Sequence, residues 1–406
     1  MTSTLKPGAL DGIKVLDLSR VLAGPWAGQM LADLGADVVK VERPGAGDDT
    51  RAWGPPWLKD AEGRDTRDAA YFFCANRNKR SVAIDIATPE GQALVRQLAA
   101  QADVLLENFK VGGLKQYGLD YDSLKTVNPR LIYCSITGFG QDGPYAQRPG
   151  YDFLIQGMGG LMSVTGPAEV PRADGESAPE GQGPQKVGVA LVDIMTGLYA
   201  SIGVLAALQH RHATGEGQHI DLALLDVQVA ALANQTANYL IGGRVPRRMG
   251  NAHPNIVPYQ DFPTADGDMI VAVGNDGQFA RLAESAGHPE WAADERFATN
   301  AARVANRATL IPLLRQATVM RTTREWIERL EAAGVPCGPI NRLDEVFADP
   351  QVVARGLRVE LPHPVAGSVP GVANPIRLSA SPVAYRTAPP TLGQHTAEVL
   401  ADWLGA

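Results

Sequence analysis

The carboxylate of Asp193 is the one charged side chain in a long apolar run from Val187 to Leu208. A carboxylate with apolar neighbours near a helix start is suited to nucleophilic attack on an acyl group. The positive end of the helix would help to keep it ionised. Asp is also a preferred N-cap residue, so a purely structural role is the alternative. The position of Asp193 alone does not decide between these two roles.

The apolar run itself predicts a strand at Val187–Val192 that breaks into a buried helix. Its length is also that of a membrane span, which needs about 20 apolar residues. We reject a membrane span because a carboxylate at mid-membrane is costly and three glycines dilute the hydrophobicity. Four apolar residues follow one another at helical spacing, namely Leu198, Ile202, Leu205 and Leu208.

Size and composition describe an ordinary soluble protein. The chain has 406 residues, 45% hydrophobic and 20% charged, which predicts two or three domains. A net charge of −7 argues against nucleic-acid binding, which needs a strong basic face. The three cysteines form no CxxC pair, and the first residues contain no apolar signal segment. We therefore expect a cytoplasmic protein that binds neither nucleic acid nor a membrane.

Strands alternate regularly with helices in the first half of the chain, which predicts an α/β fold with a doubly wound, mostly parallel sheet. A smaller unit of strand and helices is expected between Gly250 and Ala333. The expected strands are 12–18, 36–42, 81–86, 103–107, 131–137, 218–222, 268–273, 357–361 and 376–378. The expected helices are 26–34, 89–100, 151–161, 224–241, 277–286, 308–317, 323–333 and one that starts near 396.

Four cations gather near the predicted strand ends in the first third of the chain: Arg43, Arg77, Lys79 and Arg80. Open α/β sheets bind ligands beyond such strand ends. A solvated surface is the alternative for any run of like charges. The first strand, helix and second strand also resemble a dinucleotide-binding unit, but the G-x-G-x-x-G spacing is missing.

Several other chemistries lack their motifs. The seven histidines include no HExxH pair, so we expect no metal site. There is no G-x-S-x-G elbow of a serine hydrolase and no P-loop for nucleotide phosphates. The residues thus favour an α/β enzyme that acts on a small molecule.

Seven stretches in chain order together resemble family III CoA-transferases, the group of formyl-CoA transferase, carnitine CoA-transferase and 2-methylacyl-CoA racemase. Each stretch is weak alone, but seven in register are highly specific. They are GIKVLDLSRVLAGPWAGQMLADLGADVVKVERPGAGDDTR, NRNKRSVAIDIATPEGQ, DVLLENFKVGGL, ITGFGQDGPYAQRPGYD, VALVDIMTGLYASIGVLAAL with RHATGEGQHID, AGVPCGPI and LGQHT.

The resemblance implies an interlocked homodimer whose chains thread through each other. It implies a large Rossmann-like CoA-binding domain from 1–224 and 357–406, a small α+β domain at 250–335, and linkers at 225–249 and 336–356. No tightly bound cofactor is implied, because coenzyme A and acyl-CoA are substrates. The nucleophile falls on Asp193, and the implied CoA contacts are Leu22, Ala23, Arg43, Ile84, Asn108, Phe109, Lys115 and Tyr151.

The family chemistry proceeds through an aspartyl mixed anhydride and an aspartyl–CoA thioester. Some members place a basic residue against the CoA phosphates where this chain has Gln116, and Lys110 or Lys115 would substitute. The family's racemases carry a His in a G-H-D motif, where this chain has Tyr151. Tyrosine, with a pKa near ~10, is a poor partner for proton exchange at neutral pH. The sequence therefore favours a transferase over a racemase.

The finer resemblance is to the succinate–hydroxymethylglutarate, or dicarboxylate, group of these transferases. A distal substrate carboxylate in a dry site needs a cation, and arginine binds a carboxylate bidentately. Arg247 and Arg248 are expected to supply this cation, with a solvated loop as the alternative. The rival functions are a racemase of the same family and a nicotinamide-dependent dehydrogenase built on the same kind of sheet.

Overall fold

The computed structural model describes residues 7–170 and 178–405, which fall into two compact units. The first unit holds residues 1–161, 187–242 and 350–406, and the second holds 162–186 and 243–349. The exact domain boundaries expected from the sequence stay a prediction.

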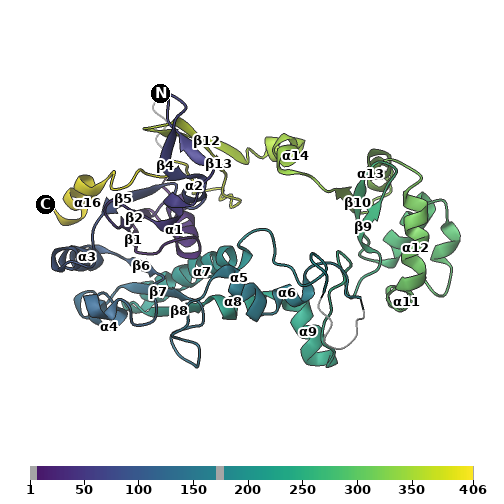
Figure 1. Ribbon diagram of the computed structural model, residues 1–406, viewed down its shortest axis with the longest axis horizontal. Coiled ribbons are helices and arrows are strands. Elements are labelled where there is room, and N and C mark those ends of the chain that lie inside the picture. Colours follow the sequence, from purple (N-terminus) through teal and green to yellow (C-terminus); the bar gives the residue numbers. More distant parts are fainter. Residues whose placement is uncertain (1–6, 171–177, 406) are drawn as a thin grey trace. The chain divides into compact units, whose positions relative to one another are not determined.

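Six parallel strands form the central sheet of the first unit, in the order β5-β2-β1-β6-β7-β8 (Figure 1). Counted along the chain, this is the 3-2-1-4-5-6 order of Rossmann-like folds, so the expected fold class is confirmed. The strands are β1 (Lys14–Asp17), β2 (Asp37–Glu42), β5 (Lys79–Ala83), β6 (Val104–Glu107), β7 (Ile132–Thr137) and β8 (His219–Ala223).

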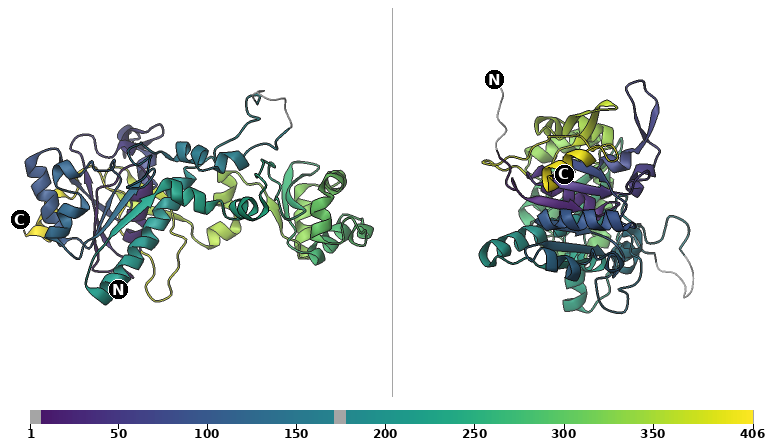
Figure 2. Two further views of the ribbon diagram at one scale, coloured as in Figure 1. Left: turned by 90° about the horizontal axis from the view of Figure 1, so that it is seen from below. Right: turned by 90° about the vertical axis from the view of Figure 1, so that its left-hand side faces the viewer.

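Alternate residues of these strands enter two cores, one on each face of the sheet. Val15 and Val38 pack into one core, and their neighbours Leu16 and Val39 pack into the other. Helices α1 (Ala23–Asp33) and α7 (Leu191–Thr214) cover the first face. Helices α3 (Pro89–Gln101), α4 (Tyr121–Val127) and α16 (Thr396–Leu404) cover the second, and α16 lies against α3 (Figure 2).

Smaller elements complete the first unit. Two hairpins, β3–β4 and β12–β13, pair antiparallel. The remaining bounds are η1 (Asp49–Ala52), β3 (Trp57–Lys59), β4 (Asp65–Ala69), α2 (Ala70–Phe73), η2 (Lys115–Tyr117), α5 (Asp152–Met158), α8 (Leu224–Ala231), α9 (Ala233–Gly242), α15 (Pro350–Ala354), β12 (Arg358–His363) and β13 (Gly367–Val372).

The second unit has its own core around a three-stranded antiparallel sheet, in the order β11-β10-β9. Phe262, Phe279 and Trp326 are among its fully buried side chains. Its elements are β9 (Tyr259–Pro263), β10 (Asp268–Ala272), α10 (Asp276–Ser285), η3 (Pro289–Ala292), α11 (Asn300–Ala305), α12 (Arg307–Thr318), α13 (Thr323–Ala332), β11 (Cys337–Pro339) and α14 (Leu343–Ala348), while α6 (Leu161–Val164) spans the division between the units.

Helix α7 is the one helix of the described residues that is long and apolar enough to cross a membrane. The core helix of a soluble protein meets the same two criteria. Ala200, Val204 and Ala207 of α7 are buried in the core beneath the sheet, and the helix packs against α1. We interpret α7 as a core helix that is buried on this face. The prediction that Leu198, Ile202 and Leu205 are buried is wrong, because these side chains lie on the opposite, exposed face.

Three expected elements are wrong. No strand forms at Val187–Val192, because side chains take its backbone groups: Val187 N–H donates to the Gln156 amide oxygen at 2.8 Å, and α7 begins at Leu191. The expected strand at 376–378 is irregular. The expected helix 224–241 is divided into α8 and α9 by Ala233, whose φ of 44° lies in the left-handed region.

Candidate active site

The candidate site lies at the switch point of the sheet, where the strand order reverses between β1 and β6. Loops that leave neighbouring strands in opposite directions open a crevice there, outside the carboxyl ends of the strands. Asn108, which follows β6, joins the two loops. Its side chain accepts a hydrogen bond from Arg20 N–H at 2.9 Å and donates to the Arg20 carbonyl at 2.7 Å.

A cavity of about 220 Å³ occupies this crevice. Five residues implied as CoA contacts line it together with Asp193: Leu22, Ala23, Asn108, Phe109 and Tyr151. These residues come from four separate stretches of the chain, which the fold brings to one place. Three cations, Arg20, Lys110 and Arg148, also line the cavity.

Asp193 stands in the first turn of α7, in the third helical position. The N-cap residue is Ala190, so the alternative role of Asp193 as an N-cap is wrong. Asp152, in the first turn of α5, takes that role instead, because its Oδ1 accepts hydrogen bonds from Val192 N–H at 2.8 Å and Asp193 N–H at 3.4 Å. The side chain of Asp193 is thereby left free to face the cavity.

The environment of Asp193 makes its carboxyl group hard to ionise. Burial raises the pKa of Asp193 from an ordinary 3.8 to about 7, and the negative charge of Asp152 adds to the increase. No hydrogen-bond donor to the Asp193 carboxylate is found among residues 7–170 and 178–405. Burial and Asp152 both oppose ionisation of Asp193. The expectation that the helix terminus keeps this group ionised stays a prediction.

Three residues implied as CoA contacts do not line this cavity. Arg43 follows β2 and is exposed, and Ile84 follows β5 and is buried in the core. Lys115 lines a second cavity, of about 260 Å³, together with Lys110 and Glu107. Lys110 lines both cavities. Arg43 and Ile84 each follow the carboxyl end of a strand of the same sheet.

Arg77, Lys79 and Arg80, which were expected to gather with Arg43, do not line this cavity. The side chains of Arg77 and Lys79 are buried, and that of Arg80 is half-buried. Each is paired with an aspartate: Arg77 with Asp33 at 2.6 Å, Lys79 with Asp17 at 2.9 Å, and Arg80 with Asp37 at 2.6 Å. They are structural ion pairs. Their signal in the sequence was the same as that of a ligand site, since only the tertiary structure supplies the partners.

Two functional candidates were missed in the sequence, Asp152 and Arg148. Both stand in the stretch that ends in RPGYD, of which the family resemblance marks only Tyr151. The Arg148 guanidinium lies over the rings of Tyr145 and Phe139, at 4.6 and 5.3 Å from the ring centroids. It contacts the sulfur of Met158 at 3.9 Å, and no carboxylate pairs with it in the described part of the chain.

Residues 10–396 match the family "CoA-transferase family III". The chain belongs to CoA-transferase family III. It is 56% identical over 393 residues to succinate–glutarate CoA-transferase of Agrobacterium fabrum, covering 97% of this chain and 95% of the relative. It is 45% identical over 404 residues to human succinyl-CoA:glutarate CoA-transferase, covering 99% of this chain and 87% of the relative.

A solved structure of a CAIB/BAIF family protein from Brucella suis matches with a TM-score of 0.84 at 53% identity. The match covers 98% of this chain and 100% of that one. The expected family and its dicarboxylate group are confirmed, and so is the expectation of an enzyme. This member of family III is a CoA-transferase, which uses CoA thioesters as substrates.

Proposed function

We propose that this family III enzyme transfers CoA from succinyl-CoA to a small dicarboxylate such as glutarate, with Asp193 as the nucleophile. The observation that carries the proposal is the placement of the Asp193 carboxyl group, without a donor of its own, on a cavity at the switch point of the sheet. The similarity to a succinate–glutarate CoA-transferase and to a succinyl-CoA:glutarate CoA-transferase supports succinyl-CoA and glutarate as the substrates.

The reaction keeps the thioester energy at every step. The Asp193 carboxylate attacks the carbonyl carbon of succinyl-CoA, and the thiolate of CoA leaves, which gives a mixed anhydride. The thiolate then attacks the aspartyl carbonyl, so that succinate leaves and an aspartyl–CoA thioester remains. The acceptor carboxylate attacks this thioester, which releases the thiolate and forms a second mixed anhydride between the acceptor and Asp193. The thiolate then attacks the acceptor carbonyl of this anhydride, which gives the new acyl-CoA and restores the Asp193 carboxylate.

The raised pKa of Asp193 fits this role. A buried carboxylate without hydrogen-bond donors has a high free energy. Its conversion to a neutral acyl group removes the buried charge and is therefore favoured. Water would hydrolyse the anhydride, so the site must also exclude solvent. The side chains of Leu22 and Phe109, which line the cavity, are apolar.

CoA is proposed to lie along the carboxyl edge of the sheet. Leu22, Ala23, Asn108, Phe109 and Tyr151 would hold it near the reacting carbonyl. Arg43 and Ile84 would hold its adenosine end, and Lys110 or Lys115 would meet its phosphates in place of Gln116, whose side chain donates to the Gly113 carbonyl.

The distal carboxylate of the dicarboxylate needs a cation. Arg148 is the candidate from the Asp193 cavity, because two aromatic rings hold its guanidinium and no carboxylate of the described residues pairs with it. Arg20, which also lines this cavity, is paired with Asp49 at 3.1 Å. Arg247 and Arg248 remain the candidates from the second unit; Arg248 is buried, and Arg247 lies 4.0 Å from Glu169.

We further propose a cytoplasmic, interlocked homodimer. Its support is a row of exposed apolar side chains on the described part of α7, where a soluble monomer would carry polar ones. These side chains are Leu198, Tyr199, Ile202 and Leu205.

The test is turnover with purified enzyme, succinyl-CoA and glutarate, followed by mass spectrometry of the trapped protein. The proposal expects a CoA adduct on the peptide that contains Asp193 and no turnover by Asp193→Ala. The matched control is Asp226→Asn, an exposed carboxylate of α8, which should keep wild-type turnover. Full turnover by Asp193→Ala, or an adduct elsewhere, would contradict it.

The racemase alternative has a separate test. Racemisation of a 2-methylacyl-CoA exchanges the α-proton with solvent, so it would introduce deuterium in heavy water. Tyr151 stands where the racemases carry a histidine, so we expect no such exchange.

A further inference from the structure

The turn between β1 and α1, residues Ser19 to Val21, is held by four side chains from separate parts of the chain. Asp17 at the end of β1 accepts from Ser19 N–H at 2.9 Å, and Lys40 of β2 donates to the Ser19 carbonyl at 2.7 Å. Asn108, after β6, bonds both backbone groups of Arg20. This turn leads directly into Leu22 and Ala23, which line the cavity.

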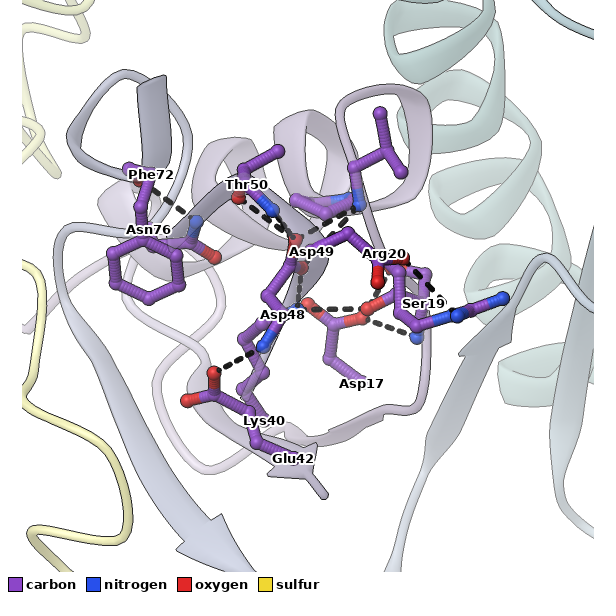
Figure 3. Close-up of polar contacts among 12 residues, drawn as sticks. Asp17, Ser19, Arg20, Lys40, Glu42, Asp48, Asp49, Thr50, Phe72 and Asn76 are labelled. Carbon is purple, nitrogen blue, oxygen red and sulfur yellow. Dashed lines mark hydrogen bonds and ion pairs between the residues drawn. The ribbon is translucent and has the colours of Figure 1, made fainter. Parts of the chain in front are cut away.

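Asp48, just before η1, lies close to Ser19, Lys40 and Thr50 (Figure 3). Both of its carboxylate oxygens lie 3.3 Å from the backbone nitrogen of Val21 and accept its N–H. One oxygen also pairs with Lys40 Nζ at 2.8 Å, so Lys40 and Asp48 together hold both ends of the turn. The other accepts from Thr50 N–H at 3.0 Å, which fixes the carboxylate itself.

The backbone conformation of Val21 is unfavourable and requires stabilising contacts from outside the turn. Its φ of 71° lies in the left-handed region, which a β-branched residue rarely adopts. Helix α1 has no side-chain cap at Leu22, so nothing in the first turn of α1 fixes its start from within. The shape of the cavity wall at Leu22 and Ala23 therefore depends on the contacts to Val21 and Ser19.

Lys40 and Asp48 cannot act on substrate directly, because both side chains are 0% exposed. Burial alone would lower the pKa of Lys40, but Asp48 and Asp17 keep it above its ordinary value. Burial would likewise raise the pKa of Asp48, but Lys40 holds it down at about 2. Both groups stay charged over the whole physiological range.

We propose that Lys40 and Asp48 are positioning residues for CoA, which hold the Ser19–Ala23 segment in the shape that binds it. This rests on the proposed function, in which the cavity takes CoA. A buried ion pair of this kind contributes little net stability compared with apolar residues of the same shape. We infer that this pair instead maintains the backbone conformation of the turn through its contacts to Ser19 and Val21.

The experiment separates geometry from stability with Lys40→Met, Asp48→Asn and the double variant. Each single variant leaves one buried charge unpaired and should lower the melting temperature. The double variant removes both charges, so its melting temperature should largely recover. Its affinity for CoA, measured by calorimetry, should stay at least about tenfold weaker, because the Ser19 carbonyl has lost its donor.

Two further measurements distinguish a change in the geometry of the turn from a general loss of stability. Amide exchange at 18–23 should rise in Asp48→Asn, a nearly isosteric variant that is expected to fold, while exchange in the core strands stays unchanged. The matched control is the buried pair Asp33 and Arg77, at 2.6 Å, which does not line the cavity. Asp33→Asn with Arg77→Met should leave CoA affinity within about twofold.

Recovery of wild-type CoA affinity in the Lys40→Met/Asp48→Asn double variant would overturn the proposal, as would an equal loss of affinity in the Asp33/Arg77 control. Failure of the unaltered enzyme to bind CoA would instead overturn the proposed function itself, and this inference with it.

Discussion

Oδ1 of Asp152 lies 3.4 Å from the backbone nitrogen of Asp193 and accepts its N–H. One aspartate thus caps the helix that carries the other. The same contact brings two negative charges together, which adds to the raised pKa of Asp193. Asp152 thereby fixes where Asp193 lies and also makes its carboxylate less stable.

Replacement of Asp193 by Asn should abolish turnover and stabilise the fold at alkaline pH. Above pH 7 the folded enzyme must carry a desolvated carboxylate, whereas the unfolded chain ionises freely from about pH 4 upwards. The pKa shift corresponds to a cost on the order of 4 kcal/mol at pH 8, which shrinks as the pH falls towards 4. Asn carries no such cost. Thermal unfolding should show a larger gain for Asp193→Asn at pH 8 than at pH 5.5, and an equal gain at both would contradict the assignment.

The pH profile of turnover should rise through about pH 7 as Asp193 ionises. Asp152→Asn removes the neighbouring negative charge but keeps an oxygen that can accept from Val192 N–H. The rising limb of kcat/KM should therefore move to lower pH. The surface variant Asp226→Asn should leave the limb where it is. A shift to higher pH, or none, would mean that Asp152 does not act on the charge of Asp193.

Removal of the Arg148 guanidinium should weaken dicarboxylate acceptors selectively. Loss of a charge-assisted contact corresponds to about 1.5–3 kcal/mol, so Arg148→Gln should raise the KM of glutarate at least about tenfold. Arg148→Lys should recover only part of this, because lysine lacks the bidentate fork. Pentanoate, which has no distal carboxylate, is the control acceptor and should be unaffected. An equal loss with pentanoate, or weaker CoA binding, would assign Arg148 to another role.

Two glycines of α7 offer a matched pair for the contact between α7 and α1. A Cβ on Gly197 would lie 2.6 Å from the Ala23 carbonyl oxygen, so Gly197→Ala should push the start of α1 away. We expect a loss of about 1–3 kcal/mol in the free energy of unfolding, together with weaker CoA binding.

Gly203 is the control, because a Cβ there would lie 3.5 Å from Ile220, at ordinary contact distance. Gly203→Ala should be neutral or stabilise the helix by up to about 1 kcal/mol. Urea unfolding of the two variants compares them directly. Equal effects of both substitutions would mean that the approach of α7 to Ala23 is not tight.

The sequence by itself determined the alternation of strands and helices, because buried parallel strands and amphipathic helices carry distinct hydrophobic patterns. That pattern was enough to predict the parallel sheet, and the seven motifs in register were enough to identify the family. It also marked Asp193, since one charge in a long apolar run is conspicuous without any structure.

Only the tertiary structure decided what surrounds each charge. The sequence showed Arg77, Lys79 and Arg80 as one basic cluster, whereas the fold separates them into three ion pairs with distant aspartates. The run before Asp193 was apolar enough for a strand, but the bonds of Val187 and Val192 to side chains of α5 exclude one. The physical reason is the same in each case: the state of a charge or an N–H group depends on partners brought close in space, and a local pattern in the chain does not contain them.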